Sequence, residues 1–344
     1  MPHKATLQDV ADATGVHRTT VSLALRNHPR IPEATRLRIH AAAEKLHYRI
    51  NPLVSALMQS RRTGKAVRHA TLAFVTAYPS RYGWRPDHHD RPDFFPGAAA
   101  RARDLGYKLE DFWLAEPGMS SKRFCDILTN RGIHGLILAR LPPDQHALDL
   151  DWTRFSNVAL GLTLRAPLLH HVTENHFDTV WQAMRECQAR GYKRPGFVYS
   201  DANDSPLVGD RWLGAYLAQQ QLLFDPKDHL PTCPPIPADE ASFATWLRKY
   251  KPDALLCTHA RPVLRWLQNL QLSVPGEVGI IDLDSHPAPD TTGLSYDPAQ
   301  IGALAVDMLV GLLHRNETGI PTAQHETLLT GTWREGSTLP HVQR

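Results

Sequence analysis

The stretch Thr6–Asn27, TLQDVADATGVHRTTVSLALRN, has the pattern of two short helices joined by a turn. Thr6 is a good helix N-cap, and Asp9 stands three residues later, where an acidic side chain can cap the backbone in return. Gly15 can adopt the left-handed backbone that ends a helix. A second helix is expected from about His17 to Leu25. This order of signals predicts a helix-turn-helix.

The second helix separates an apolar face from a polar and basic one. Val21 and Leu25 are expected to be buried. The opposite face carries Arg18, Thr19, Ser22, Leu23 and Arg26. An arginine there can reach a guanine edge in a major groove, while hydroxyl groups and a further arginine can hold phosphates. In a third helix, Leu37, Ala41 and Leu46 are expected to pack on the first two. The alternative is an ordinary helical hairpin with a solvated basic face.

With the residues that follow, the chain resembles the lactose-repressor (LacI/GalR) family of transcriptional regulators. The resemblance rests on TLQDVADATGVHRTTVSLAL, on a third helix from about Pro32 to Leu46 that ends in AEKLHY, and on NPLVSAL. It is dense over roughly residues 4–60 and continues to about residue 335 through the order of strands and helices. It implies a helix-turn-helix head at 1–50, a hinge helix and linker at 51–69, and an effector-binding and dimerisation core at 70–344.

The resemblance also implies which residues contact DNA. Arg18 and Leu23 occupy base-reading positions, with Thr19 beside them, and Leu57 matches the leucine that family members wedge between base pairs. His17 stands where many members have a serine cap, so its role is open: base contact, phosphate contact or neither. The full expected set is Thr6, His17, Arg18, Thr19, Thr20, Ser22, Leu23, Arg26, Thr35, Tyr48, Asn51 and Leu57.

The hinge segment Asn51–Met58 is expected to form a helix only with partners. It begins with an N-cap and a proline at the first helical position, but a helix of about two turns is marginal alone in water. The resemblance supplies the partners: the same segment of a second subunit and a DNA minor groove. The alternative is a helix that only links the head to the core.

Charge is spread unevenly over the 344 residues, whose net charge is +3. Residues 1–68 hold 12 Lys+Arg and 4 Asp+Glu, a balance of +8, whereas the remainder holds 26 and 31, a balance of −5. A basic head on an acidic body indicates a polyanion as the partner of the head alone. Four dispersed cysteines without a CxxC pair predict reduced thiols. Without an apolar run of membrane-spanning length or a signal-peptide core, we expect a cytoplasmic protein.

From Ala70 onward, strands and helices alternate in two blocks, which predicts two parallel-sheet lobes. By resemblance, this α/β core is similar to type I periplasmic sugar-binding proteins, in which the chain crosses between the lobes three times. The crossings are expected near Gly161, Pro287–Gly293 and Gly319–Gln324. They divide the core into lobe one, at about 70–161 and 293–320, and lobe two, at about 162–290 and 324–335.

Candidate effector ligands follow from the same resemblance. Arg211 matches a ligand-holding arginine and Asp284 a strand-terminal aspartate that faces the ligand. A guanidinium and a carboxylate can bracket vicinal hydroxyls, although the two could instead form a structural ion pair. Tyr82 or Trp84 could stack on a sugar face, and for Trp84 a hydrophobic lid is equally open. His259 stands where the family usually has an Asn-Asp pair.

Other chemistries find little support. Asp284-Ser285-His286 does not make a triad by adjacency, and neither a GxSxG elbow nor a GxxxxGK[ST] loop is present. The pairs His170-His171 and His88-His89 lack the spacing of a metal-binding helix. We therefore expect no enzyme, cofactor or metal. The sequence predicts a homodimeric repressor that binds double-stranded DNA at a pseudo-palindromic operator and responds to a sugar or related metabolite. The alternative is a small-molecule binding protein that does not read DNA specifically.

Overall fold

The computed structural model describes residues 6–25, 30–46, 48, 70–85, 93–199, 206–235, 238–283 and 290–342. The chain forms two compact units. The first holds the residues up to Ala70 together with Gly311–Glu317, and the second holds Thr71–Val310 and Thr318–Arg344. Among the described residues, no helix is long and apolar enough to cross a membrane.

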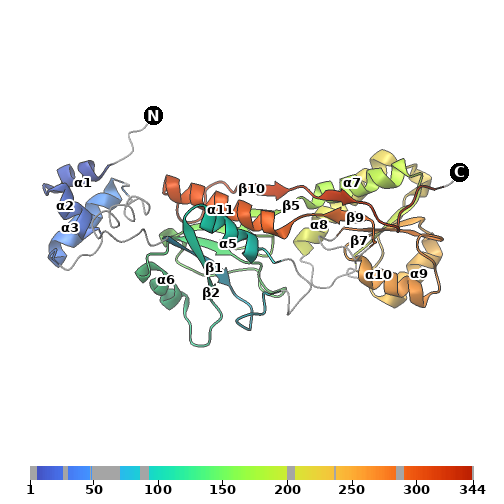
Figure 1. Ribbon diagram of the computed structural model, residues 1–344, viewed down its shortest axis with the longest axis horizontal. Helices are drawn as coiled ribbons and strands as arrows, with labels where there is room; N and C mark the ends of the chain where they lie inside the picture. The colour runs from blue at the N-terminus through green and yellow to red at the C-terminus, as the bar shows by residue number, and fades with distance from the viewer. Residues whose placement is uncertain are drawn as a thin grey trace. The chain divides into compact units, whose positions relative to one another are not determined.

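The first unit contains the three helices α1 (Leu7–Thr14), α2 (Arg18–Ala24) and α3 (Glu33–Lys45) (Figure 1). The predicted reciprocal cap is present: the Thr6 backbone N–H donates to Asp9 Oδ2 over 2.6 Å, and the Asp9 N–H donates to Thr6 Oγ1 over 3.3 Å. Gly15 ends α1 with φ of +65°. These local signals were sufficient to predict the helix-turn-helix, which is confirmed.

The three helices enclose a small apolar core, which consists of Val10, Ala11, Val21, Ala24, Ile39 and Ala43. The expected packing of α3 was wrong in part, because Leu37 is 63% exposed and Ala41 is exposed. Ile39 and Ala43 face inward instead, four residues apart on one side of the helix. Leu37 precedes Ile39 by two positions, which places it on the opposite side of α3. Leu25, expected to be buried, is half-buried.

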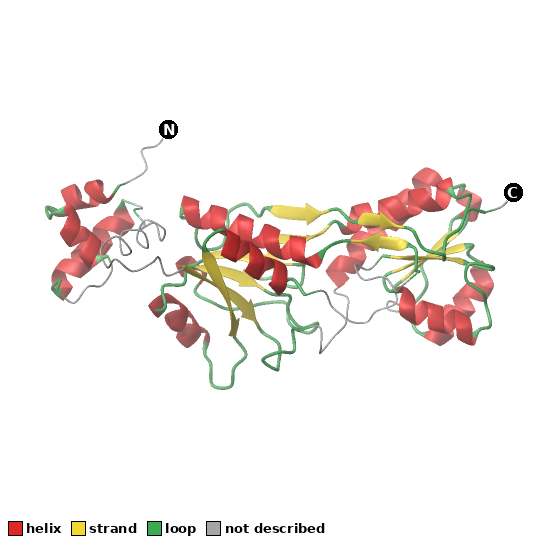
Figure 2. Cartoon of the chain, in the orientation of Figure 1, coloured by secondary structure: helices red, strands yellow, loops and turns green. Residues whose placement is uncertain are grey.

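The second unit contains two sheets (Figure 2). The six-stranded sheet has the order β10-β5-β4-β3-β1-β2. Its strands are β1 (Ala70–Thr76), β2 (Tyr107–Trp113), β3 (Gly135–Leu138), β4 (Ser156–Leu160), β5 (His170–Glu174) and β10 (Glu326–Leu329). The pairs β1–β3, β3–β4, β4–β5 and β5–β10 are parallel, as predicted for an α/β core.

Alternate residues of β1 serve the two faces of this sheet. Val75 joins a core with Phe124 and Leu128 of α6 (Ser121–Asn130). Phe74 points the other way and meets Phe95 of α5 (Phe95–Asp104), with ring centroids 5.1 Å apart. On that face α5 packs against α11 (Pro298–Arg315), and both are drawn over the sheet in Figure 1. A short 3-10 helix, η2 (Trp152–Arg154), precedes β4.

The five-stranded sheet has the order β11-β9-β8-β7-β6. Its strands are β6 (Pro195–Val198), β7 (Ala254–Cys257), β8 (Gly279–Asp282), β9 (Gly293–Ser295) and β11 (Thr332–Arg334). One core of this lobe joins the sheet to α7 (His176–Ala189) and α8 (Pro206–Leu223), and a second joins it to α9 (Glu240–Tyr250) and α10 (Ala260–Asn269). The sheet therefore carries a helical layer on each face, as a mostly parallel sheet requires.

The strands are divided between the sheets differently from the expectation. β5 and β10, expected in lobe two, pair with each other in the first sheet, and β9, expected in lobe one, pairs with β8. The chain therefore changes sheets after Glu174, after Ser295 and after Leu329, later each time than expected. Gly161 does turn the chain, with φ of +69°, but β5 returns beside β4. A turn signal marks the end of a strand and does not say which sheet the next strand joins.

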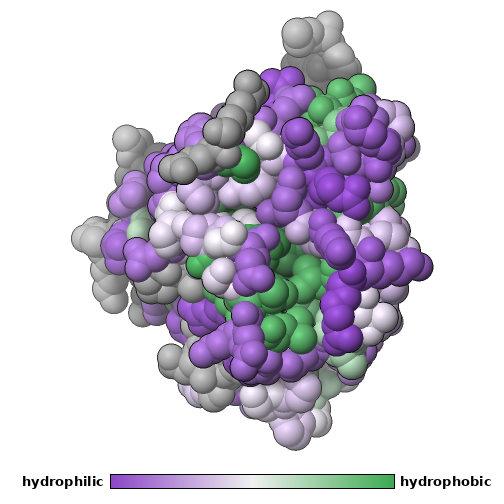
Figure 3. Space-filling model, turned by 90° about the vertical axis from the view of Figure 1, so that its right-hand side faces the viewer, coloured by the Kyte–Doolittle hydropathy of each residue, from purple (hydrophilic) through white to green (hydrophobic). Residues whose placement is uncertain are grey.

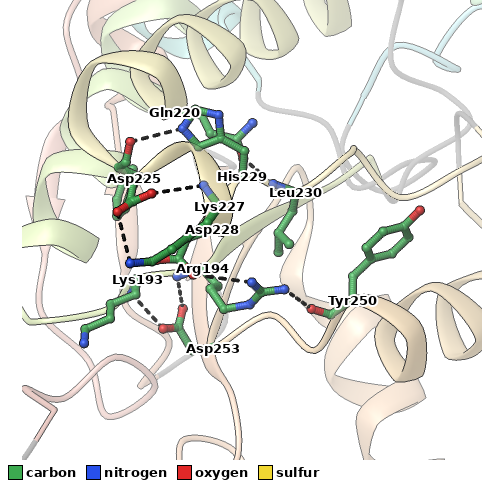
Figure 4. Close-up of polar contacts among 11 residues, drawn as sticks. Lys193, Arg194, Gln220, Asp225, Lys227, Asp228, His229, Leu230, Tyr250 and Asp253 are labelled. Atoms are coloured by element: carbon green, nitrogen blue, oxygen red, sulfur yellow. Dashed lines mark hydrogen bonds and ion pairs between the residues drawn. The ribbon is translucent and has the colours of Figure 1, made fainter.

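A polar network fixes the start of β6 in the second lobe (Figure 4). Asp253 accepts from the backbone N–H groups of Lys193 and Arg194 over 2.7 and 2.9 Å. The Arg194 guanidinium donates to the Tyr250 carbonyl over 2.7 Å and pairs with Asp228 of the 3-10 helix η3 (Pro226–Asp228) at 3.4 Å. These contacts tie the strand to the end of α9 and to the loop after α8, a structural role.

Candidate functional site

The exposed surface of α2 carries several of the predicted DNA contacts. Arg18 and Thr19 are exposed, and His17 is exposed at the N-cap position just before the helix. Thr20, Ser22 and Leu23 are half-buried. The apolar side of the same helix is held by Val21 and Ala24, which are completely buried. α2 is thus anchored on one side and presents a guanidinium and a hydroxyl on the other, groups suited to base edges and phosphates.

The remaining predicted contacts divide into two groups. Thr6 is exposed but is engaged in the cap of α1, Thr35 is half-buried on α3, and Tyr48 packs half-buried against the core of the head. Burial raises the pKa of the Tyr48 hydroxyl, which therefore stays protonated at neutral pH and can donate. Arg26, Asn51 and Leu57 lie outside the described residues, as does the whole hinge segment 51–58.

In the core, Arg211 is engaged by a glutamate that the sequence reasoning did not identify. Its Nη1 lies 2.5 Å from Oε1 of Glu326, the first residue of β10. His171 of β5 approaches the same oxygen, with Nε2 at 2.8 Å, and Gln324 donates to Nδ1 of His171 over 2.8 Å. Burial alone would raise the pKa of Glu326, but hydrogen bonds from Arg211 and His171 and their charges outweigh it and lower that pKa. Asp284, the predicted partner of Arg211, lies outside the described residues.

A second charged group lies at the carboxyl ends of β3 and β5. Glu174, the last residue of β5, is buried, and both of its oxygens lie 3.3 Å from Nη2 of Arg140. Nε2 of His176 lies 2.8 Å from Oε1 of Glu174, a close charge contact without hydrogen-bond alignment. Burial opposes ionisation of Glu174, but the charges of His176 and Arg140 prevail and hold its pKa far below the usual range. Glu174 is therefore a carboxylate at neutral pH.

The loop after β1 places its two candidate aromatic residues differently. Tyr82 is 52% exposed, with the Arg81 guanidinium 5.6 Å from its ring centroid. Trp84 is only 6% exposed and packs against Phe74, with ring centroids 5.2 Å apart. Its indole N–H donates to the Arg81 carbonyl over 3.1 Å, and the Arg85 guanidinium lies 4.1 Å from its ring. Trp84 is thus buried among aromatic side chains, whereas about half of the Tyr82 side chain is exposed.

The other candidates are dispersed. His259 is half-buried at the N-cap position of α10. His170 accepts from the His325 backbone N–H over 3.0 Å, and its ring packs 4.8 Å from that of His325. Within the described ranges, no three His, Cys, Asp or Glu side chains gather as a metal site, and His88-His89 lies outside them.

The sequence did not identify three charged residues of these two groups: Glu174, Arg140 and Glu326. A signal existed for Glu174 in the stretch Val172–Asn175, which resembles the Val-x-x-Asp-Asn motif of the LacI/GalR family with a glutamate in place of the aspartate. No comparable signal marked Glu326, because it contacts Arg211 across 115 residues of chain. Carboxyl ends of parallel strands are where ligands bind in open α/β sheets. Glu174 and Arg140 lie at such ends, whereas Glu326 begins β10 and lies at the amino end of its strand.

Two family models match the chain. The model described as "Bacterial regulatory proteins, lacI family" matches residues 6–51. The model described as "Periplasmic binding protein-like domain" matches residues 184–339. The first match covers the capped helix-turn-helix, and the second covers all five strands of the second sheet together with α11 and β10.

Full-length relatives and solved structures agree with these matches. The HTH-type transcriptional regulator GalR of Escherichia coli K12 is 24% identical over 325 residues, which cover 90% of this chain and 89% of GalR. Its namesake in Salmonella typhimurium LT2 is 25% identical over 327 residues, with the same coverage. The lac repressor dimer bound to operator and the anti-inducer ONPF is 18% identical, with a TM-score of 0.55 and coverage of 98% and 100%. A CelR–cellobiose complex is 17% identical, with a TM-score of 0.54 and coverage of 97% and 99%. At such identities the structural likeness establishes the fold.

Proposed function

We propose that the chain is a transcriptional repressor of the LacI type, because a helix-turn-helix that matches the LacI family model precedes a periplasmic-binding-protein-like core. It binds a specific double-stranded operator through its head and responds to a small metabolite in its core. Its relatives are named as transcriptional regulators rather than enzymes. A regulator that acts on the chromosome works in the cytoplasm.

The geometry of α2 is the observation that carries this proposal. Its buried side fixes the helix in the head, while Arg18 and Thr19 stand exposed on the other side. The surplus of basic residues in the first 68 positions adds the non-specific attraction to phosphate that DNA-binding heads need. An ordinary helical hairpin does not need both an exposed polar face on its second helix and an excess of basic residues, so the combination favours DNA binding.

Binding to DNA in increasing salt tests the proposal. The full-length protein should shift a selected palindromic fragment at concentrations roughly a thousandfold or more below those needed for random DNA. Affinity for both should fall with salt because counterions are released. Equal affinity for both fragments would favour the alternative, a small-molecule binding protein without specific DNA reading. If binding is specific, genome-wide mapping of bound sites would identify the regulated genes.

The active species is proposed to be a homodimer on a pseudo-palindromic site. A twofold pair of heads places one reading helix in each half-site, so protein and DNA share their symmetry. The surface also includes an apolar area that could form an interface. Figure 3 shows apolar side chains gathered at the centre of one face and ringed by hydrophilic ones, a pattern typical of protein contact surfaces. Sedimentation of the free protein at micromolar concentration should give twice the chain mass.

The proposed effector is a sugar or a related polar metabolite. Two groups of charged side chains near the ends of strands support this proposal: Arg211–Glu326–His171 and Arg140–Glu174–His176. Both groups contain hydrogen-bond donors and acceptors for the hydroxyl groups of a ligand. Asp284→Ala should abolish the response of operator binding to an active sugar and leave basal DNA binding intact. A panel of mono- and disaccharides that includes glucose and cellobiose is the probe. Unchanged sugar affinity in this variant, measured by calorimetry, would remove Asp284 from the site.

A further inference from the structure

The side chains of His17 and Thr19 form a hydrogen-bonded pair at the start of α2. The Thr19 backbone N–H donates to Nδ1 of His17 over 3.4 Å, and Thr19 Oγ1 lies 2.8 Å from the same nitrogen. Both side chains are exposed. Because a backbone N–H can only donate, Nδ1 of His17 must carry a lone pair, and the proton of the neutral ring therefore sits on Nε2.

This tautomer decides what the Thr19 hydroxyl can do. Since Nδ1 of His17 accepts, the Thr19 O–H donates its single proton to that nitrogen. The lone pairs that remain on Thr19 Oγ1 can only accept a hydrogen bond from outside. An unpaired threonine hydroxyl would rotate to donate or to accept and would discriminate poorly between base edges. The pair thus gives Thr19 a fixed polarity.

Building on the proposed DNA-binding function, we infer that Thr19 accepts a hydrogen bond from an exocyclic amino group in the major groove, N6 of adenine or N4 of cytosine. His17 is the positioning residue that enforces this choice. In the major groove adenine and cytosine present amino donors, whereas thymine O4 and guanine O6 are acceptors. A hydroxyl group that can only accept therefore binds the amino group of adenine or cytosine and is repelled by the carbonyl oxygen of thymine or guanine. Each half-site therefore has one position that requires an amino group.

Selection of operators from a randomised library by the full-length protein tests this inference. Wild type should favour adenine or cytosine at one position of each half-site. Thr19→Val, which removes the hydroxyl at nearly constant shape, should lower that preference by about two- to tenfold, the value of one neutral hydrogen bond. His17→Ala should admit thymine or guanine there, because the released hydroxyl can then donate. His17→Asn should keep the wild-type preference, because its amide oxygen can accept from Thr19 in the same way.

A variant of the buried core separates this effect from loss of stability. Ile39→Val weakens the packing of the head, where Ile39 is completely buried, without touching the exposed face of α2. It should leave the base preference unchanged. In the selected operator, the favoured base is then replaced by an analogue without its amino group. Wild type should lose about two- to tenfold in affinity, and Thr19→Val should lose nothing further.

The outcomes distinguish the inference from the function on which it depends. A wild type that selects a specific operator with thymine or guanine at the position that responds to Thr19→Val would overturn the inference alone. So would a His17→Ala variant with unchanged preference. A wild type that selects no sequence at all would overturn the proposed function as well.

Discussion

At the scale of single residues, Arg18 is the exposed cation of α2, and the family resemblance predicts that it reads a base. Arg18→Ala should weaken binding by about 1–3 kcal/mol for each half-site of the selected operator and relax the preference at one position of each half-site. Titration of the operator and of random DNA with both proteins measures this. An equal loss on both DNAs would assign Arg18 to phosphate contact instead.

The buried carboxylate of Glu174 leads to a second residue-scale prediction. Arg140 and His176 lower the pKa of Glu174 in the folded state, so its ionised form stabilises the fold above its unfolded pKa, near 4.5. This contribution is lost as the pH falls through the folded value. Glu174→Gln should therefore lower the free energy of unfolding by about 3–5 kcal/mol at pH 7, and the difference from wild type should shrink progressively as the pH falls below about 4.5.

Urea unfolding followed by tryptophan fluorescence at neutral and acidic pH checks the role of Glu174. Asp126→Asn serves as the control, because Asp126 pairs with Lys122 and Arg154 in an exposed position. Exposed pairs contribute little to stability, so this variant should unfold nearly as wild type does. A Glu174→Gln protein with wild-type stability at pH 7 would contradict the buried ion-pair account.

At the scale of elements, α5 and α11 approach so closely that only glycine fits at their contact. A Cβ on Gly97 would lie 2.0 Å from the carbonyl oxygen of Ala299, and one on Gly302 would lie 2.0 Å from that of Phe94. Gly97→Ala and Gly302→Ala should each force the helices apart and destabilise the core by about 1–3 kcal/mol or more. Gly214→Ala, in α8 with open space around it, should instead stabilise by up to about 1 kcal/mol.

Thermal unfolding of these three variants decides the point. If Gly214→Ala raises the stability and the other two variants lower it, the close contact between α5 and α11, and not helix propensity, explains the glycines at positions 97 and 302. A stabilised Gly97→Ala or Gly302→Ala protein would mean that α5 and α11 have room between them.

The elements also show how far the sequence could be used for prediction. The cap of α1 and the Gly15 turn were predictable, since each depends on residues a few positions apart. The same holds for most helices and strands of the core. Membership of β5, β9 and β10 in their sheets was not predictable, because it depends on pairing with distant strands. The Arg211–Glu326 contact and the burial of Trp84 are set by the same long-range packing, so the candidate site was predicted only in part.

At the scale of the whole molecule, the proposed dimer must match its operator in spacing as well as in sequence. Two reading helices related by a twofold axis engage half-sites on one face of the duplex, separated by about one helical turn or a multiple of it. Inserting about 5 base pairs between the half-sites rotates one of them to the opposite face. Each head then loses the gain in effective concentration that its tethered partner provides, a gain of at least about a hundredfold.

We therefore expect the operator with the insertion to bind about as weakly as a single half-site, with roughly a hundredfold or greater loss in affinity. Gel-shift titration of the intact operator, the operator with the insertion and the single half-site measures this directly. Arg18→Ala provides the internal comparison, because its loss should appear twice on the intact operator and once on the single half-site. Full affinity for the operator with the insertion would mean that the heads move independently, and a single half-site bound as tightly as the whole would mean that a monomer reads the DNA.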